Sequence, residues 1–179
     1  MPDPVATQSF RDALAQFASG VTVVAARDAG GLTGLTATAF CSVSLDPALV
    51  LVSVARTASA HDRIVRADRL GISVLTLDQA WIAQQFAQHG VDRFLGVRLD
   101  PDRGVPLIVG ALAHLECTHH AAHLAGDHTL LVVEVVESTA FAGAPLVHHG
   151  RTLGGFSAVP KKGDGAREEP TPASHPRRA

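Results

Sequence analysis

The stretch GLTGLTATAFCSVSLDP, residues 31–47, decides how the fold of this chain is interpreted. Its small and hydroxyl-bearing side chains are typical of extended backbone, and they leave room for a flat polar ligand to lie against the main chain. Each Thr or Ser hydroxyl in it can donate or accept a hydrogen bond. On composition alone a plainer interpretation also stands, in which alternating Thr and Ser cover the half-solvated face of a sheet.

Extended segments lie on both sides of this stretch. VTVVAA at 21–26 precedes it through a glycine-containing turn at 27–31, which predicts a hairpin. After the break at Asp46-Pro47, ALVLVSVA at 48–55 has the continuous apolar character of a barrel strand buried on both faces. Because strands outnumber helices and several follow each other directly, we predict an antiparallel β-barrel with a few helices packed outside it. The further strands are expected at 71–75, 105–117, 129–137 and 145–150.

Three short helices are expected where a capping residue precedes apolar residues at helical spacing. They begin at Ser9, Ser59 and Asp78. The first is amphipathic, and its apolar positions are Phe10, Leu14, Phe17 and Ala18.

Length and composition limit the class of protein. At 179 residues, 46% of them hydrophobic, the chain suits one domain with a single core, which we assign to residues 1–158. Residues 159–179 contain four prolines, mixed charge and no aromatic residue, which predicts a disordered tail. The net charge of -2 and the lack of a basic stripe argue against nucleic acid as a partner. Without a signal-peptide pattern or a run of ~20 apolar residues, we expect no membrane partner and a cytoplasmic location.

The two cysteines, Cys41 and Cys117, are interpreted as small buried thiols, because a chain this apolar needs no disulfide. Cys117 also stands near His119, His120 and His123, and thiolate and imidazole are zinc ligands. Their spacing fits no standard zinc pattern, so we expect no metal site and interpret the segment as a histidine-rich loop near the mouth of the active site. No Ser-His-Asp order or nucleophile elbow supports hydrolase chemistry.

Several motifs together resemble the flavin reductase-like family, whose members fold as FMN-binding split barrels. The order T-A-T-A-F-C-S-V-S-L-D-P at 36–47 is similar to the family's flavin-contacting strand and turn, apart from Ala48, where the family has a second proline. The resemblance implies a mainly β fold, an antiparallel split β-barrel with a few peripheral helices. It extends over about Phe10 to Phe156 through D-R-F at 92–94, G-x-P at 104–106, L-E-C at 115–117 and G-D-H at 126–128.

The resemblance also implies which residues hold the flavin. Arg56, Thr57 and Ser59 would bind the phosphate at the start of a helix, although alanines at 58 and 60 leave fewer hydroxyls than relatives carry. Without the resemblance, the same residues make an ordinary helix cap with a solvated arginine. Arg93 and Phe94 would lie next to the cofactor, or Phe94 would only anchor the core. The expected isoalloxazine contacts are Thr36, Ala37, Thr38, Ala39, Ser42, Val43 and Ser44.

His128 is the predicted catalytic residue. The resemblance places it near the exposed face of the flavin, where it would orient the nicotinamide, since hydride transfer needs close stacking more than a strong acid or base. A structural histidine held by Asp127 is the plainer interpretation. His149 and Arg151 are expected on the nicotinamide side, although the aromatic residues frequent there in the family are missing.

The implied function is an NAD(P)H-dependent flavin reductase that transfers hydride from NADH or NADPH to FMN or FAD. The resemblance implies a homodimer with each flavin near the subunit interface, and a separate flavin-dependent oxygenase that receives the reduced flavin. One alternative is a flavin-binding split-barrel protein without reductase turnover, such as a flavin carrier or an oxidase-like relative. Another is a dimerisation domain that has kept the barrel and lost the ligand.

Overall fold

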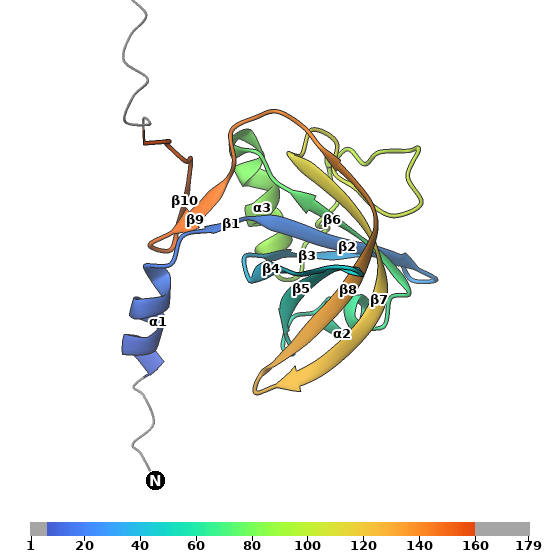
Figure 1. Cartoon of the computed structure of the whole chain (residues 1–179), viewed down its shortest axis with the longest axis horizontal. Coiled ribbons are helices and arrows are strands. Elements are labelled where there is room, and N and C mark those ends of the chain that lie inside the picture. The colour runs from blue at the N-terminus through green and yellow to red at the C-terminus, as the bar shows by residue number, and fades with distance from the viewer. Residues whose placement is uncertain (1–6, 160–179) are drawn as a thin grey trace, which may run out of the picture.

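A seven-stranded antiparallel sheet forms the barrel in a computed structural model of the chain, which describes residues 7–159 (Figure 1). The strand order is β3-β2-β6-β7-β8-β5-β4, so β3 and β4 are the two edges of the sheet. The prediction of a mainly β, antiparallel barrel with a few outer helices is confirmed. The strands are β2 (Thr22–Asp28), β3 (Gly31–Ala37), β4 (Phe40–Leu45), β5 (Ala48–Ala55), β6 (Arg69–Val74), β7 (Ala113–Ala125) and β8 (His128–Ala140).

Strand β2 is buried on both faces because two separate cores lie against it. Val24 and Ala26 belong to the core inside the barrel. Val23 and Ala25 belong to a second core that α3 (Ala80–Ala87) covers from outside. The chain therefore buries two apolar layers rather than the single core expected from its length.

The hairpin predicted through residues 27–31 is confirmed, because β2 pairs with β3 from Thr22–Ala37 to Asp28–Gly31. Gly31 makes the turn with a φ of +92°, a conformation that side-chain-bearing residues rarely adopt. The short helix α2 (His61–Val65) fixes this turn through Arg63, whose Nε donates to Asp28 Oδ2 at 2.7 Å. That hydrogen bond lowers the pKa of the Asp28 carboxyl.

Strand β5 has the predicted bounds, but the prediction that both its faces are buried is wrong. Val50, Val52 and Val54 are buried in the barrel, whereas Leu49 and Leu51 on the other face are only half-buried. A continuous apolar run does not reveal which face stays uncovered, because the pattern lacks the polar alternation that marks a solvated side.

Helix α3 begins close to the predicted position. A 3₁₀ turn, η1 (Leu77–Gln79), precedes it, and the side chain of Gln79 accepts a hydrogen bond from the Thr76 N–H at 3.2 Å. Phe86 is 1% exposed against β3, where a Cβ added to Gly34 would lie 2.8 Å from its ring. A glycine at position 34 thus allows the helix to approach the sheet closely.

The strand predicted at 105–117 is only partly confirmed, since β7 begins at Ala113. Residues 105–108 are buried in an irregular loop that lies over β6. The Ile108 N–H donates to Ser73 Oγ at 2.9 Å, and His114 Nε2 donates to the Ile108 carbonyl at 2.7 Å. These side chains supply the hydrogen bonds that a neighbouring strand would otherwise supply.

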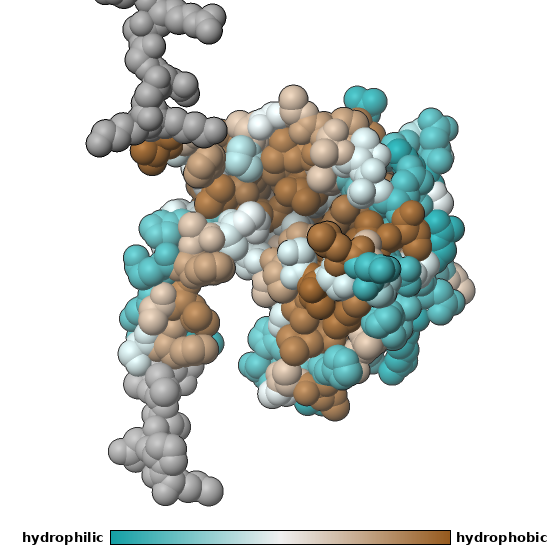
Figure 2. All heavy atoms as spheres, in the orientation of Figure 1, coloured by the Kyte–Doolittle hydropathy of each residue, from teal (hydrophilic) through white to brown (hydrophobic). Residues whose placement is uncertain are grey.

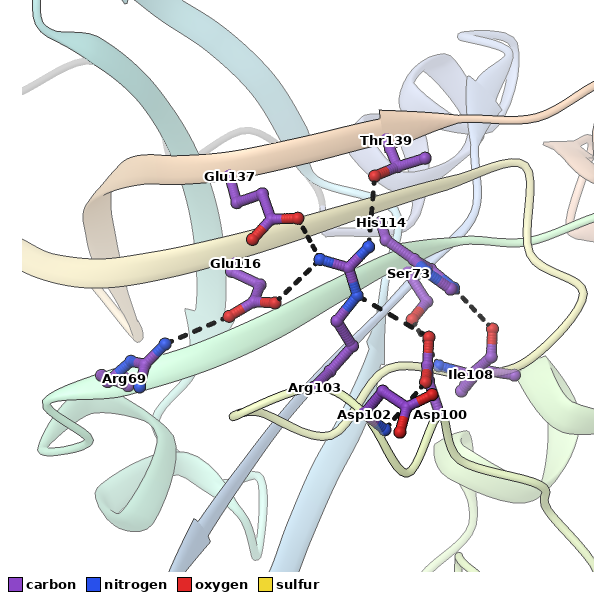
Figure 3. Close-up of polar contacts among 10 residues, drawn as sticks. All are labelled: Arg69, Ser73, Asp100, Asp102, Arg103, Ile108, His114, Glu116, Glu137 and Thr139. Atoms are coloured by element: carbon purple, nitrogen blue, oxygen red, sulfur yellow. Dashed lines mark hydrogen bonds and ion pairs between the residues drawn. The ribbon is translucent and has the colours of Figure 1, made fainter.

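Arg103 holds the same loop by charge (Figure 3). Its guanidinium pairs with Asp100 at 3.7 Å, with Glu116 at 3.3 Å, and with Glu137. Glu116 is 6% exposed and also pairs with Arg69 at 3.1 Å. Because β6, β7 and β8 contribute Arg69, Glu116 and Glu137 respectively, the network ties the loop across three strands.

Helix α1 (Thr7–Ala15) stands away from the barrel (Figure 1). It already includes Thr7, so the start predicted at Ser9 is too late. Phe10 and Leu14 are 53% and 56% exposed, and Figure 2 shows apolar side chains on the side of α1 that faces the barrel across a gap. Beside it lies the small sheet of β1 (Ser19–Gly20), β9 (Val147–His149) and β10 (Thr152–Gly154).

The two cysteines differ in burial. Cys117 is buried as predicted, and its burial, with the nearby Glu116 charge, raises the pKa of its thiol to about 12. The prediction that Cys41 is buried is wrong, because it lies exposed on the edge strand β4.

The predicted disordered tail lies outside the described residues except for Val159. Within residues 7–159, no helix is long and apolar enough to cross a membrane, and no group of three or more His, Cys, Asp or Glu is placed to hold a metal ion.

Candidate functional site

A cavity of about 340 Å³ opens where the two edges of the sheet do not meet. β4 pairs with β5 only as far as Phe40 and Val52, whereas β5 continues to Ala55. The last three residues of β5 therefore have no paired strand on the side away from β8. The cavity occupies this position and is lined by 35–39, 53–55, 57–58, the end of α3, Arg93 and His128.

Small side chains line much of this cavity. Ala37, Ala39 and Ala55 carry only a methyl group, so a ligand can approach the main chain closely. The chain leaves β3 after Ala37, and the Ala39 carbonyl accepts a hydrogen bond from the Ser53 N–H at 3.0 Å. That bond holds the connection between β3 and β4 at the rim of the cavity.

Three lining hydroxyls are free, and a fourth is already used. Thr36 Oγ1 donates to the Ala83 carbonyl at 2.6 Å, so its proton joins β3 to α3. The hydroxyls of Thr38, Ser53 and Thr57 have no hydrogen-bond partner within residues 7–159. They are available to a ligand with a polar edge.

The predicted phosphate-binding residues separate in the structure. Thr57 lines the cavity, whereas Arg56 lines a neighbouring hollow. Ser59 lies outside the cavity lining, and its hydroxyl accepts a hydrogen bond from Arg93 at 3.0 Å. Ser59 is also not the helix cap, because α2 begins after Ala60 with no side-chain cap.

Arg93 joins three segments around the cavity. Its guanidinium donates to the Gln88 carbonyl at 2.7 Å, the Gly34 carbonyl at 3.1 Å and the Ser59 hydroxyl. The side chain also lines the cavity, which brings a cation to its wall. Phe94, by contrast, does not line it and packs edge-on against Phe86 at 4.9 Å between ring centroids.

His128 lies at the cavity with one ring nitrogen engaged. Its Nδ1 is 2.7 Å from Asp127 Oδ1, and this hydrogen bond lowers the pKa of the Asp127 carboxyl. If Nδ1 carries the proton, Nε2 is an acceptor, and it has no partner within the described part of the chain. The hydrogen bond to Asp127 thus leaves Nε2 available to a ligand in the cavity.

The structure does not bring Ser42, Val43 and Ser44 to this cavity. They lie on β4 beyond the point where it pairs with Val52, and Ser44 Oγ accepts a hydrogen bond from the Asp46 N–H at 3.2 Å. Their predicted ligand contacts have no geometric support from the single chain.

A second hollow, of about 440 Å³, lies between α1 and the barrel and shares Thr38 and Ala39 with the cavity. Arg151 lines it and pairs with Asp12 on α1. His148 lines it in place of the predicted His149, which lies outside both linings.

The sequence-based prediction missed Ser53 and His89, which also line the cavity. Ser53 could have been found, since it is the only polar residue in the apolar run 48–55. No comparable signal marks His89, because it reaches the cavity only through the position of the end of α3.

The model of the "Flavin reductase like domain" family matches residues 14–157 of the chain. The chain is 43% identical over 152 residues to FMN reductase (NADH) SmoA of Agrobacterium fabrum. This match covers 84% of this chain and 87% of that protein. It is also 41% identical over 140 residues to the reductase component of a flavin-dependent trigonelline monooxygenase of Acinetobacter baylyi. This match covers 76% of this chain and 45% of that protein.

The fold is also similar to solved structures. The NADH:FAD oxidoreductase SgcE6 of Streptomyces globisporus, solved in complex with NAD and FAD fragments, superposes with a TM-score of 0.80 at 38% identity. The match covers 88% of this chain and 96% of that one.

Proposed function

The chain belongs to the flavin reductase like domain family, and we propose that its cavity binds FMN or FAD for reduction by NADH or NADPH. The enzyme is an NAD(P)H:flavin oxidoreductase. The observation that carries the site assignment is the cavity between β3 and the end of β5, with its small side chains, free hydroxyls and His128.

A flavin fits the chemistry of this cavity. The main chain at 36–39 and the hydroxyls of Thr38 and Ser53 suit the polar edge of a planar ring, and the alanines suit its flat face. Thr57, together with the cation of Arg93, suits the ribityl phosphate. The volume also lies near the lower end of the roughly 300–1,000 Å³ of small-molecule sites.

The bound flavin supplies an acceptor for the hydride that leaves C4 of the nicotinamide. In our proposal His128, oriented by Asp127, positions the nicotinamide against the ring and does not abstract a proton. The hollow beside α1 continues from Thr38 and Ala39, so the nicotinamide nucleotide would extend toward Arg151. The chain's contribution is thus to hold two rings in contact.

We further propose a homodimer. The support is α1, whose apolar residues Phe10 and Leu14 are 53% and 56% exposed. Light scattering after size-exclusion chromatography should give twice the mass of one chain. Leu14→Asp should shift the mass toward the monomer, whereas an unchanged dimer would place the interface elsewhere.

The proposed partner is a separate flavin-dependent oxygenase that receives reduced flavin. Support comes from the Acinetobacter baylyi relative, which is named as the reductase component of a monooxygenase. NADH-driven reduction of cytochrome c that depends on added flavin would measure the release of reduced flavin. A flavin that stays bound through turnover would argue against this transfer.

Crossing both nicotinamides with both flavins tests the main proposal. Nicotinamide oxidation should rise with added flavin and follow saturation in both substrates. Flavin binding without stimulated oxidation would instead support the flavin carrier or oxidase-like alternative. Absence of flavin-induced thermal stabilisation would support a dimerisation domain without a ligand.

A further inference from the structure

The Arg93 guanidinium at the wall of the cavity has no carboxylate partner. Its four hydrogen bonds go to the Gln88 carbonyl, which accepts two, to the Gly34 carbonyl and to the Ser59 hydroxyl. Within residues 7–159 nothing else engages this side chain, so its positive charge is not compensated. Because a guanidinium has five N–H donors, one N–H also remains for a ligand.

The segment that carries Arg93 lies between two glycines. Gly90 and Gly96 have φ of +73° and +75°, and the residues between them belong to no helix or strand. Within the segment, the Phe94 N–H donates to Asp92 Oδ1 at 3.0 Å, which is only a local contact. The position of Arg93 therefore depends on the contacts that join this segment to the rest of the fold.

Gln85 on α3 supplies such a contact. Its side-chain Nε2 donates to the Arg93 carbonyl at 2.8 Å and to the Leu95 carbonyl at 3.0 Å, which uses both N–H groups of the amide. Between these two carbonyls, Phe94 packs edge-on against Phe86 of the same helix. Gln85 thus attaches the backbone on both sides of Phe94 to α3, although it does not itself line the cavity.

We propose that Gln85 is a positioning residue for the flavin phosphate, because it holds the backbone of Arg93 and so keeps the guanidinium at the cavity wall. The inference rests on the proposed function and deepens it, since Arg93 is there assigned to the ribityl phosphate. A residue that only stabilised the fold would affect the binding of every flavin alike. A residue that acts through Arg93 should affect only flavins that carry a phosphate.

Riboflavin lacks the phosphate of FMN, so the ratio of the two affinities isolates the phosphate contact. Fluorescence titration of the full chain measures both affinities. Gln85→Met removes both N–H donors and keeps a side chain of similar length. It should lower FMN affinity about tenfold, the size expected for two lost hydrogen bonds, and riboflavin affinity by less than about twofold.

Gln84→Met is the matched control. Gln84 precedes Gln85 on α3, is exposed, and has no hydrogen-bond partner in the described part of the chain. Its substitution removes the same amide from the same helix and should leave the ratio of FMN to riboflavin affinity at the wild-type value.

A double variant tests whether Gln85 acts through Arg93. Arg93→Met alone should lower the ratio of FMN to riboflavin affinity at least as much as Gln85→Met does. Adding Gln85→Met to Arg93→Met should then change the ratio by less than about twofold, because no guanidinium is left to position. A further loss of about tenfold in the double variant would show that the two residues act independently and would overturn the proposal.

The remaining outcomes separate this inference from the proposed function. Equal losses of FMN and riboflavin affinity in Gln85→Met, or an unchanged ratio, would overturn the positioning role and leave the reductase proposal standing. A wild type that binds FMN no more tightly than riboflavin would overturn the phosphate contact of Arg93 and this inference with it. Failure of the wild type to bind either flavin would overturn both proposals.

Thermal unfolding of each variant checks that it is folded. If Gln85→Met does not fold, Gln85→Glu takes its place, because an ionised carboxylate has no N–H to donate to the two carbonyls. Gln84→Glu is then the control, since it adds the same charge one residue away. The same loss of FMN affinity relative to riboflavin is expected in Gln85→Glu, and its absence would overturn the proposal.

Discussion

Gly71 on β6 lies directly beneath Pro106, so close that a Cβ at position 71 would be 2.3 Å from the Pro106 carbonyl oxygen. The contact is between two backbones, so no side-chain rotation can relieve it. Because position 71 has no side chain, the irregular loop at 105–108 can pack directly against β6.

Gly71→Ala should therefore destabilise the fold by about 2–3 kcal/mol, because one backbone must move to admit the methyl group. Urea denaturation followed by circular dichroism measures the loss. Gly20→Ala is the control, since nothing lies within 4 Å of its added Cβ. A Gly71→Ala protein as stable as the control would show that the loop moves freely.

The buried carboxylate of Glu116 should matter more to stability than a half-buried carboxylate outside the network. Glu116→Gln leaves Arg69 and Arg103 without one shared counter-charge, so we expect a loss of about 2 kcal/mol in the free energy of unfolding. Glu134→Gln on the neighbouring strand, which has no ion pair within residues 7–159, should change stability by less than about 0.5 kcal/mol. Equal effects in urea denaturation would contradict the importance of the network.

The ion pair of Asp28 with Arg63 should contribute to stability in a pH-dependent way. Hydrogen bonding to Arg63 lowers the pKa of Asp28 in the folded state. Its contribution is therefore present above the unfolded pKa of about 4 and is lost as the pH falls through the lower folded value. The difference in melting temperature between wild type and Asp28→Asn should shrink as the pH falls from about 6 toward 2. A constant difference would show that the ion pair contributes nothing.

The two thiols should react very differently. Cys41 is exposed, whereas Cys117 is buried and the pKa of its thiol is raised to about 12, so it stays protonated at neutral pH. A chromogenic disulfide reagent should titrate one thiol per native chain and two after denaturation. Cys41→Ser should abolish the native reaction, and a persisting fast reaction would mean that Cys117 is accessible.

His128→Ala should lower the nicotinamide-dependent rate about tenfold or more while flavin affinity changes little, because the residue is proposed to position only the nicotinamide. Asp127→Asn tests the same role through orientation, since it weakens the hydrogen bond to Nδ1. It should raise the KM for the nicotinamide more than it changes flavin binding. Equal losses of flavin affinity and rate would mean that His128 is structural.

Local sequence signals predicted the strands better than their surroundings. The strand at 48–55 and the turn at 27–31 were predicted correctly, because the preference of β-branched residues for strands and of glycines for turns depends only on a few neighbouring residues. The predicted burial of Cys41 and the predicted two-sided burial of β5 were wrong, because Cys41 pairs with Leu51 on the outer face of the sheet, and this face stays partly exposed. Which face of a strand is covered depends on tertiary packing, which no local pattern reports.

The candidate site was likewise predicted well where local sequence decides and poorly where long-range packing decides. The threonine and alanine pattern at 36–39 placed the cavity wall, and G-D-H placed His128. Arg56 and Phe94 instead face a neighbouring hollow and the core, because the direction of a side chain depends on loops and helix packing at long range. Ser53 could be recognised in the sequence as the polar residue of an apolar run. Assigning it to the cavity, however, requires knowing that β5 extends beyond the last residue of β4 that pairs with it.

The incomplete pairing of β5 has a consequence for handling the protein. Along residues 53–55 the Ser53 N–H already donates to the Ala39 carbonyl and the Ala55 carbonyl already accepts from the Ala58 N–H. A flavin seated there would shield the rest of this strand edge from another chain's backbone. Protein without flavin should therefore aggregate sooner on storage than protein saturated with flavin. Saturation with flavin should also slow deuterium uptake at residues 53–55.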